Sequence, residues 1–333
     1  MTRHVIYTHG GGRLGNQLLN YANLLAFELE HPEFEVLDLA MHPYAELYGS
    51  PVSPLSDIQE NSPDGHWRPL IRYGWGSGIA EQVFSHRPFN RLRYQTLHRV
   101  AEWRDDAQSV VGGNTHFPFE VAGDSYDQVD LAASSMVRRL ETKRVSVLAG
   151  WGVRGWSLVE KYRDQIRDDL QPAQRYLDPA REYIRSLQSS HDLVVGVLIR
   201  QGDYRTWNDG RYFFTTQEYR ELMEAFQQKF AEKDICFVIA SDESQDPELF
   251  EGSSYQFATG DPFGPGHYLE NFSELSLCDM VLTPPSTFST FAAFLGDCQL
   301  VPLHEHVLED GFEQLDRPLL DSLADEHMGQ SIK

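Results

Sequence analysis

Arginine and aspartate side chains follow directly on a buried apolar segment, in an arrangement suited to binding an anion. Residues 193–199 (LVVGVLI) are apolar and rich in β-branched residues, and Arg200, Gln201, Gly202 and Asp203 come next. The run predicts a strand buried on both faces of a parallel sheet, and ligands bind beyond the carboxyl ends of such strands. A guanidinium there offers forked donors for a phosphate or a carboxylate. Arg200 and Asp203 could equally pair with each other and close a turn.

Two later segments of the same kind also end in polar residues. Residues 235–240 are predicted as a buried strand that ends at Ser241 and Asp242, and the strand 280–283 precedes Ser286 and Thr287 at a helix start. Because crossovers between parallel strands are right-handed, the three strand ends should meet at one edge of the sheet. Hydroxyls and backbone N–H groups at a helix start suit a phosphate. A simple N-cap is the alternative role for either residue.

A glycine-rich segment near the N-terminus is a second candidate nucleotide site. Gly10, Gly12 and Gly15 fit the pattern G-x-G-x-x-G between a short predicted strand and an apolar helical segment. The next predicted strand, 34–37, ends at Asp38, where a dinucleotide site places the acid that binds ribose. Taken alone, this segment favours an NAD-dependent oxidoreductase.

Asn16 and Gln17 argue for a different ligand at that segment. A dinucleotide site needs small or apolar residues there, because the start of the helix packs on the strand. Two carboxamides instead offer hydrogen bonds to a polyol or a phosphate. The alternative for Asn16 is that it caps the helix.

Composition narrows the class of protein. The chain has 333 residues, enough for about two domains, and 41% of them are hydrophobic, which indicates a globular protein. A formal net charge of −22 disfavours nucleic acid and anionic lipid as partners. Cys236, Cys278 and Cys298 lack metal-ligand spacing and suit a reducing compartment. With no signal-like or membrane-length apolar run, we expect a cytoplasmic protein without a membrane segment.

Predicted strands and helices alternate along the chain, which is typical of an α/β fold. Beyond those named above, the sequence predicts strands at 4–8, 109–111 and 145–148 and helices over 127–141, 158–170, 171–188, about 215–233, 271–278 and 287–294. Glu218 stands where a capping box with Thr215 would need it. Residues 40–105 show poor periodicity, and we interpret their aromatic residues as core. A glycine–tryptophan loop after the strand 145–148 makes Trp151 and Arg154 candidate substrate contacts.

Several segments together resemble the family-11 α-1,2-fucosyltransferases. Residues 11–22 (GGRLGNQLLNYA) are similar to the N-terminal signature of that family, with Arg13 as one extra residue. Residues 197–204 (VLIRQGDY) resemble its motif His-Ile-Arg-Arg-Gly-Asp-Tyr. Ser241-Asp242 and the later Ser286-Thr287-Phe288-Ser289 fit two further signatures, and the order and spacing agree from about residue 10 to 296.

This resemblance implies a GT-B-like α/β architecture of two Rossmann-like domains that face a cleft. We expect an N-terminal, acceptor-side domain over residues 1–185, a nucleotide-sugar-binding domain over 186–300 and a C-terminal extension over 301–333. The implied activity is that of a metal-independent, inverting glycosyltransferase that transfers fucose from GDP-fucose to a glycan hydroxyl. The partners are then a nucleotide-sugar donor and a glycan acceptor, and no cofactor is needed.

The resemblance also implies roles for individual residues. Arg200 would grip the diphosphate and stabilise the leaving GDP. Independently of the resemblance, Asp203 is the acid nearest to Arg200 in the sequence and would be either the catalytic base or the group that orients Arg200; we favour orientation because an ion-paired carboxylate is a weak base. The implied donor site consists of Gly12, Gly15, Asn16, Gln17, Arg200, Asp242, Asn271, Ser286, Thr287 and Phe288.

Some positions depart from the family pattern. Leu198 stands where the family has its histidine, Gln201 where it has a second arginine, and Asn271 where relatives tend to have an aspartate. The Trp-Trp pair that usually follows Ser-Thr-Phe-Ser is replaced by residues 290–291. These departures allow another nucleotide or another sugar. An NAD-dependent oxidoreductase and a catalytically idle sugar-binding relative therefore stay as alternatives.

Overall fold

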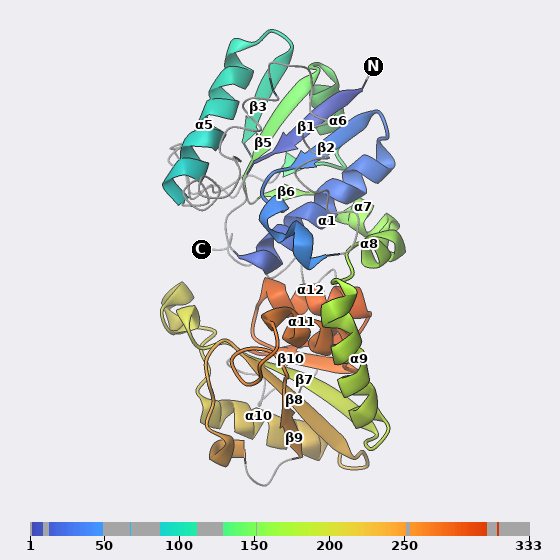
Figure 1. The fold of residues 1–333 in the computed structure, drawn as a ribbon, viewed down its shortest axis with the longest axis vertical. Helices are drawn as coiled ribbons and strands as arrows, with labels where there is room; N and C mark the ends of the chain where they lie inside the picture. The colour runs from blue at the N-terminus through green and yellow to red at the C-terminus, as the bar shows by residue number, and fades with distance from the viewer. Residues whose placement is uncertain are drawn as a thin grey trace. The chain divides into compact units, whose positions relative to one another are not determined.

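The computed structural model describes residues 2–8, 13–48, 67, 87–111, 129–150, 152–250, 254–304 and 312. The chain divides into two compact units, unit 1 over Met1–Asp169 and unit 2 over Leu170–Lys333. Each unit is built on a parallel sheet with helices packed against it (Figure 1). The predicted α/β class with two Rossmann-like units is confirmed.

Unit 1 contains a four-stranded parallel sheet in the order β2-β1-β5-β3. Each strand covers a predicted one, shifted or extended by one or two residues. Val5 at the centre of the sheet lies opposite Val36 on one side and Ser146 on the other. The strands are β1 (Arg3–Tyr7), β2 (Phe34–Asp38), β3 (Ala107–Val111) and β5 (Val145–Ala149). A separate parallel pair consists of β4 (Val129–Asp130) and β6 (Val153–Arg154).

The helices of unit 1 differ from the prediction in three places. The helix expected over 127–141 begins at Ser134, because β4 pairs with β6 and Asp130 Oδ1 accepts the Ala132 N–H at 2.9 Å. The helix expected over 158–170 is interrupted at Tyr162. Helix α5 (Arg87–Trp103) was not predicted from the sequence. The helical elements are α1 (Leu14–Glu30), η1 (His42–Leu47), α5 (Arg87–Trp103), α6 (Ser134–Glu141), α7 (Trp156–Lys161) and α8 (Arg163–Asp169).

Unit 2 contains a five-stranded parallel sheet in the order β11-β10-β7-β8-β9. The strands are β7 (Leu193–Ile199), β8 (Ile235–Ser241), β9 (Tyr255–Phe257), β10 (Met280–Thr283) and β11 (Gln299–Pro302). Because β10 and β8 flank β7, the three polar strand ends meet at one edge, as the sequence predicts. Ile199 lies opposite Ser241, so the residues that follow them are neighbours.

The helical elements of unit 2 follow the predicted order. They are α9 (Gln174–Gln188), η2 (Asp203–Arg205), η3 (Trp207–Gly210), α10 (Thr216–Lys229), η4 (Pro247–Phe250), α11 (Tyr268–Leu277) and α12 (Thr287–Gly296). The capping box of Thr215 and Glu218 is present. Helix α11 begins three residues earlier than predicted, because His267 and Glu270 form a capping box there.

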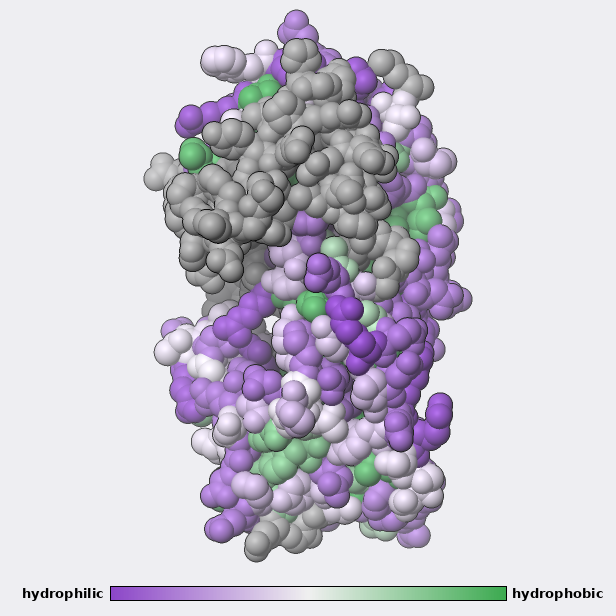
Figure 2. All heavy atoms as spheres, viewed as in Figure 1, coloured by the Kyte–Doolittle hydropathy of each residue, from purple (hydrophilic) through white to green (hydrophobic). Residues whose placement is uncertain are grey.

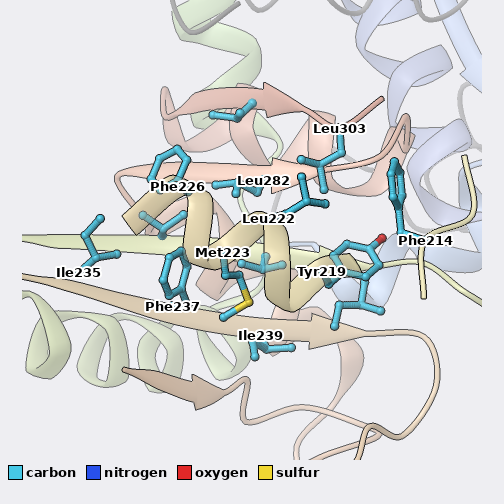
Figure 3. Packing of buried hydrophobic residues seen from close by; sticks show 14 of the residues in the cluster. Phe214, Tyr219, Leu222, Met223, Phe226, Ile235, Phe237, Ile239, Leu282 and Leu303 are labelled. Carbon is cyan, nitrogen blue, oxygen red and sulfur yellow. The ribbon is translucent and has the colours of Figure 1, made fainter. Parts of the chain in front are cut away.

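The two faces of this sheet are covered differently. On one face, α10 packs Tyr219, Met223 and Phe226 onto β7 and β8 in an apolar core (Figure 3). On the other face, α11 approaches β7 so closely that a Cβ at Gly196 would lie 2.7 Å from Leu275 Cδ2. An alanine at this position would therefore force the Leu275 side chain or its neighbours to shift.

The face of the molecule shown in Figure 2 is largely hydrophilic where residues are described, with small apolar patches. Cys236, Cys278 and Cys298 are buried free thiols. Within the described ranges, no helix is both long enough and apolar enough to cross a bilayer.

Candidate active site

Arg200 lies at the carboxyl end of the central strand of unit 2. Its backbone N–H donates to Tyr219 Oη at 3.1 Å, which ties the strand end to the first turns of α10. Burial raises the pKa of Tyr219 well above its ordinary value, so the hydroxyl stays neutral. The Arg200 side chain is 15% exposed. The strand end is thus fixed by the core, while the mostly buried Arg200 side chain keeps a small exposed part.

Two carboxylates and one ring hold the Arg200 guanidinium. Nη2 donates to Asp203 Oδ1 at 2.7 Å, and Nε lies 3.5 Å from Asp242 Oδ2 in an ion pair without a hydrogen bond. The guanidinium carbon lies 4.7 Å from the centre of the Tyr204 ring, in cation–π contact. The Tyr204 hydroxyl donates to the Pro285 carbonyl, so the loops after β7 and β10 are tied together.

Asp242 joins two strand ends. Its Oδ1 accepts the Gln201 backbone N–H at 2.9 Å while Oδ2 faces Arg200, and the side chain is 15% exposed. A Cβ at Gly202 would lie 3.2 Å from Asp242 Oδ2 and would crowd this contact. The structure therefore brings Arg200, Asp203 and Asp242 together, as the sequence predicts for the strand ends.

Gln201 belongs to a buried amide network. Its Nε2 donates to the Phe214 carbonyl at 3.0 Å, and its Oε1 accepts from Gln245 Nε2 at 3.0 Å. Thr216 Oγ1 closes the network at 2.6 Å from Gln245 Oε1. Gln201 stands where the resembled motif has its second arginine, and both its side-chain nitrogen and its side-chain oxygen are hydrogen-bonded. Leu198, where that motif has histidine, is buried in β7.

The start of α12 is the third part of this edge. Ser286 occupies the N-cap position, but its side chain makes no capping hydrogen bond, and its carbonyl accepts from Thr290 N and Oγ1 at 3.0 and 2.7 Å. Thr287 and Phe288 are half-buried, and the Phe288 ring meets Phe272 edge-on at 5.1 Å. The first-turn N–H groups of α12 give this end a partial positive charge.

Asn271 holds a loop of its own unit. Its Nδ2 donates to the Asp261 carbonyl at 2.7 Å and its Oδ1 accepts the Gly260 N–H at 2.8 Å. The side chain is 5% exposed. Both ends of the amide are thus occupied, which gives Asn271 a structural role in this loop.

The glycine-rich segment leads into α1 of unit 1. Arg13 is the N-cap residue, and Asn16 N donates to the Arg13 carbonyl at 3.0 Å, so Asn16 lies inside the first turn and the N-cap interpretation of it is wrong. Gly15 and Gln17 are buried and Asn16 is half-buried. Gly12 lies outside the described residues.

One oxygen of the Asp38 carboxyl is hydrogen-bonded by its own turn. Oδ1 accepts the N–H groups of Ala40 and Met41 at 2.8 and 2.9 Å, and the residue is 5% exposed. Burial raises the pKa of its carboxyl to about 7. A buried acid in a tight turn is poorly placed to bind the ribose of a dinucleotide.

Arg154 lies in a polar cluster inside unit 1. Its Nη1 donates to Asn20 Oδ1 and to the Val153 carbonyl, both at 2.7 Å, and it is 3% exposed. Burial lowers the pKa of its guanidinium to about 10. Its predicted neighbour Trp151 lies outside the described residues. Sequence reasoning missed this pairing, although Gln17, Asn20 and Asn23 recur at three-residue spacing on α1.

Tyr204 is the site residue that the sequence analysis left without a role. It stands four residues after Arg200, and the irregular turn η2 brings its ring under the guanidinium. The sequence signal that could have identified Tyr204 is its position at the end of the motif 197–204. No group of three or more potential metal-ligating side chains gathers anywhere in the part of the chain that the structure describes.

No family model matches the sequence, and no curated protein matches it. Solved structures match the fold. A variant of FUT1 from Arabidopsis thaliana in complex with GDP has a TM-score of 0.53 at 12% identity, over 90% of this chain and 70% of that chain. POFUT1 in complex with GDP-fucose has a TM-score of 0.51 at 15% identity, over 89% and 95% of the two chains. Fucosyltransferase NodZ from Bradyrhizobium has 0.47 at 13% identity, over 92% and 96%. The first two matches show that this chain shares the fold of proteins solved with GDP and with GDP-fucose.

Proposed function

We propose that this chain is an inverting glycosyltransferase that transfers fucose from GDP-fucose to a glycan hydroxyl, with the α-1,2 linkage that its sequence resemblance suggests. The observation that carries the proposal is the Arg200 guanidinium, held by Asp203 and Asp242 where three strand ends meet. The fold shared with proteins solved with GDP and GDP-fucose supports the same ligand class.

The proposed reaction has one bond made and one bond broken. The acceptor oxygen attacks C1 of fucose, and the bond from C1 to the β-phosphate oxygen breaks with its electron pair on that oxygen. The acceptor hydroxyl loses its proton, so the products are the fucosylated glycan, GDP and a proton. Arg200 meets the charge that develops on the leaving phosphate. Because a guanidinium supplies this positive charge, we propose that the reaction needs no metal ion.

The neighbouring groups have matching proposed roles. Ser286, Thr287 and the N–H groups at the start of α12 bind the phosphates, and Phe288 lines the base pocket. Asp242 holds Arg200 and orders the loop after β7. A part of Gly12, Gly15, Asn16 and Gln17 in donor binding stays a prediction from the sequence, while Asn271 is proposed to act on the donor site through the loop that it holds. A cytoplasmic setting stays a prediction from the sequence.

Asp203 is proposed to orient Arg200. Its Oδ1 accepts from Nη2 at 2.7 Å, which aligns one edge of the guanidinium. Under this proposal, the acceptor proton leaves late, after the bond to GDP has largely broken.

The test compares nucleotide binding and turnover in matched arginine variants. Calorimetry with GDP, UDP and NAD should give binding of GDP, whereas binding of NAD alone would favour the oxidoreductase. Arg200→Ala should lower turnover by about two to three orders of magnitude, and Arg200→Lys should rescue poorly because lysine lacks the fork. Arg205→Ala is the control, since Arg205 is exposed and pairs with Glu243 at 2.8 Å.

Three results would contradict this proposal. Turnover of Arg200→Ala near that of the wild type would remove Arg200 from the reaction. Activity abolished by EDTA and restored by Mn²⁺ or Mg²⁺ would contradict metal independence. Binding of GDP-fucose without transfer or hydrolysis would favour a catalytically idle sugar-binding protein.

A further inference from the structure

A buried carboxylic acid of unit 2 holds the loop 258–267, which joins β9 to α11. Glu274 lies on α11 and is 0% exposed. Its two carboxyl oxygens lie 3.2 and 3.1 Å from the Thr259 backbone nitrogen, and Oε1 lies 2.5 Å from Thr259 Oγ1. Burial raises the pKa of the Glu274 carboxyl to about 7. The start of the loop is thus bonded to this acid through both its main chain and its side chain.

The Thr259 hydroxyl faces a second carboxylate. Thr259 Oγ1 lies 3.3 Å from Glu270 Oε2, on the first turn of α11. A hydroxyl has one hydrogen, and an ionised carboxylate only accepts. With both acids ionised, the hydroxyl can donate to one of them, and the other carboxylate faces an oxygen lone pair. With a proton on Glu274, the acid donates to Thr259 Oγ1 and the hydroxyl donates to Glu270, so every contact is satisfied.

The loop packs directly on side chains of α11. Gly266 N donates to the Thr259 carbonyl at 3.2 Å, which closes the loop on itself. A Cβ at Gly266 would overlap Glu270 Oε2, and one at Gly260 would overlap Asn271 Oδ1. The loop backbone therefore lies against α11 at both of its ends. Its position depends on the contacts that these side chains make.

The surroundings of Glu274 favour its neutral form. After burial, the negative charge of Glu270 raises the pKa of Glu274 further. Tyr183 of α9 and Cys278 at the end of α11 also face Glu274, and burial raises the pKa values of both, so they stay neutral. Of the other elements packed against α11, β8 contributes the thiol of Cys236, and β7 and α12 contain no titratable side chain.

We propose that Glu274, Thr259 and Glu270 form a pH-sensitive latch that fixes the loop 258–267 to α11 as long as Glu274 holds its proton. When that proton leaves for solvent, two carboxylates compete for one hydroxyl hydrogen and repel each other, and the loop is released. Asn271, which bonds the same loop, then loses its partners there. The inference goes beyond the proposed function and does not depend on it.

The direction of the pH dependence follows from the two states of Glu274. A glutamate exposed by the released loop has a pKa of about 4.3, whereas in the closed latch burial raises the pKa to about 7. The closed form therefore keeps a proton that the released form gives up. Its stability is complete below about pH 4.3 and falls as the pH rises to 7, by at most about tenfold in the closing equilibrium per pH unit.

The experiment is hydrogen exchange of the full chain, read by mass spectrometry at pH 5, 6, 7 and 8 and corrected for the intrinsic exchange rate. Protection of the loop amides should fall about tenfold to a hundredfold between pH 5 and 7 and then level off. Amides of β7 in the same samples report global unfolding. Glu274→Gln should keep the loop protected at every pH, because its amide donates to Thr259 Oγ1 and accepts the Thr259 N–H as the protonated acid does.

Two variants separate the latch from other titrating groups. Asp38→Asn is the matched control, because Asp38 is a buried acid of unit 1 whose pKa burial also raises to about 7. His267→Asn removes the ring whose Nδ1 accepts the Leu269 N–H at 3.2 Å, and leaves a residue suited to the same N-cap. Both variants should keep the loss of loop protection that the wild type shows.

A second pair of variants tests the hydroxyl directly. Thr259→Val should lower the protection of the loop at pH 5 about tenfold, whereas Thr259→Ser, which keeps the hydroxyl, should not. Equal protection in these two variants would overturn the inference. Loop protection that is constant from pH 5 to 7 in the wild type, a loss in Glu274→Gln as large as that of the wild type, or a loss abolished by His267→Asn would overturn it as well.

Discussion

Replacement of Asp203 by asparagine distinguishes an orienting group from a catalytic base. Asp203 is 52% exposed and accepts one hydrogen bond from Arg200 at 2.7 Å. An ion pair exposed to this extent contributes up to about 1 kcal/mol, because water screens it. Since 1.4 kcal/mol corresponds to a factor of ten, loss of the pair should weaken GDP binding about twofold to fivefold. Hydrolysis of GDP-fucose without acceptor should fall by a similar factor.

A catalytic base would give a different pattern. Loss of general-base catalysis lowers the rate of transfer by about two to four orders of magnitude. Donor binding and hydrolysis in the absence of acceptor would then survive, because neither needs a proton removed from the acceptor. The two roles therefore predict losses in different reactions. The loss of transfer rate expected for a catalytic base is also at least about tenfold larger than the loss of binding and hydrolysis expected for an orienting group.

The assay measures GDP affinity by calorimetry, donor hydrolysis without acceptor, and transfer to lactose. Glu243→Gln is the control. Glu243 is also a part-exposed carboxylate, but it pairs with Arg205, at 2.8 Å, and not with Arg200. Transfer lost with binding and hydrolysis intact would refute the orienting role. Tighter GDP binding in Asp203→Asn would refute it as well, because it would mean that Asp203 competes with the phosphates for Arg200.

Two further predictions concern stability. Burial raises the pKa of Asp38 and of Glu274 to about 7, so the folded protein keeps protons that the unfolded chain releases above about pH 4.5. The free energy of unfolding should therefore fall as pH rises from 5 to 7, by at most about 1.4 kcal/mol per pH unit for each group. Urea titrations at several pH values measure this slope, and a slope that Glu274→Gln leaves unchanged would count against it. Gly196→Ala should destabilise the protein by about 1–3 kcal/mol, because the added Cβ would lie 2.7 Å from Leu275 Cδ2. Gly155→Ala, where the nearest atom is 3.4 Å away, should cost less in the same denaturation assay.

Much of unit 2 could be predicted from local sequence patterns. Strand β7 begins and ends where the apolar run 193–199 begins and ends. A strand buried on both faces contains no polar residue, so the run marks both of its ends. The start of α10 could be predicted because its capping box is formed by Thr215 and Glu218, which are only three residues apart in the sequence. The meeting of Arg200, Asp203 and Asp242 follows from the parallel order of three strands.

Other features depend on residues far apart in the sequence. Gln201 is bonded to Gln245 and Arg154 to Asn20, and no pattern around any of the four indicates its partner. Helix α5 is a different case. Its buried residues Tyr94, Leu97, His98 and Ala101 have helical spacing, but the surrounding residues 40–105 show poor periodicity and hid that signal.

The attachment of Arg200 at several points has a consequence for ligand binding. A free arginine side chain has about 2 kcal/mol of rotamer entropy, much of which is normally lost when a ligand immobilises it. Here Asp203, Asp242 and the Tyr204 ring already restrict the guanidinium in the folded chain. That ordering penalty therefore falls on the folding equilibrium, and an anion that reaches Arg200 meets a donor that is already oriented. Loosening any of the three contacts would return part of the penalty to the binding step.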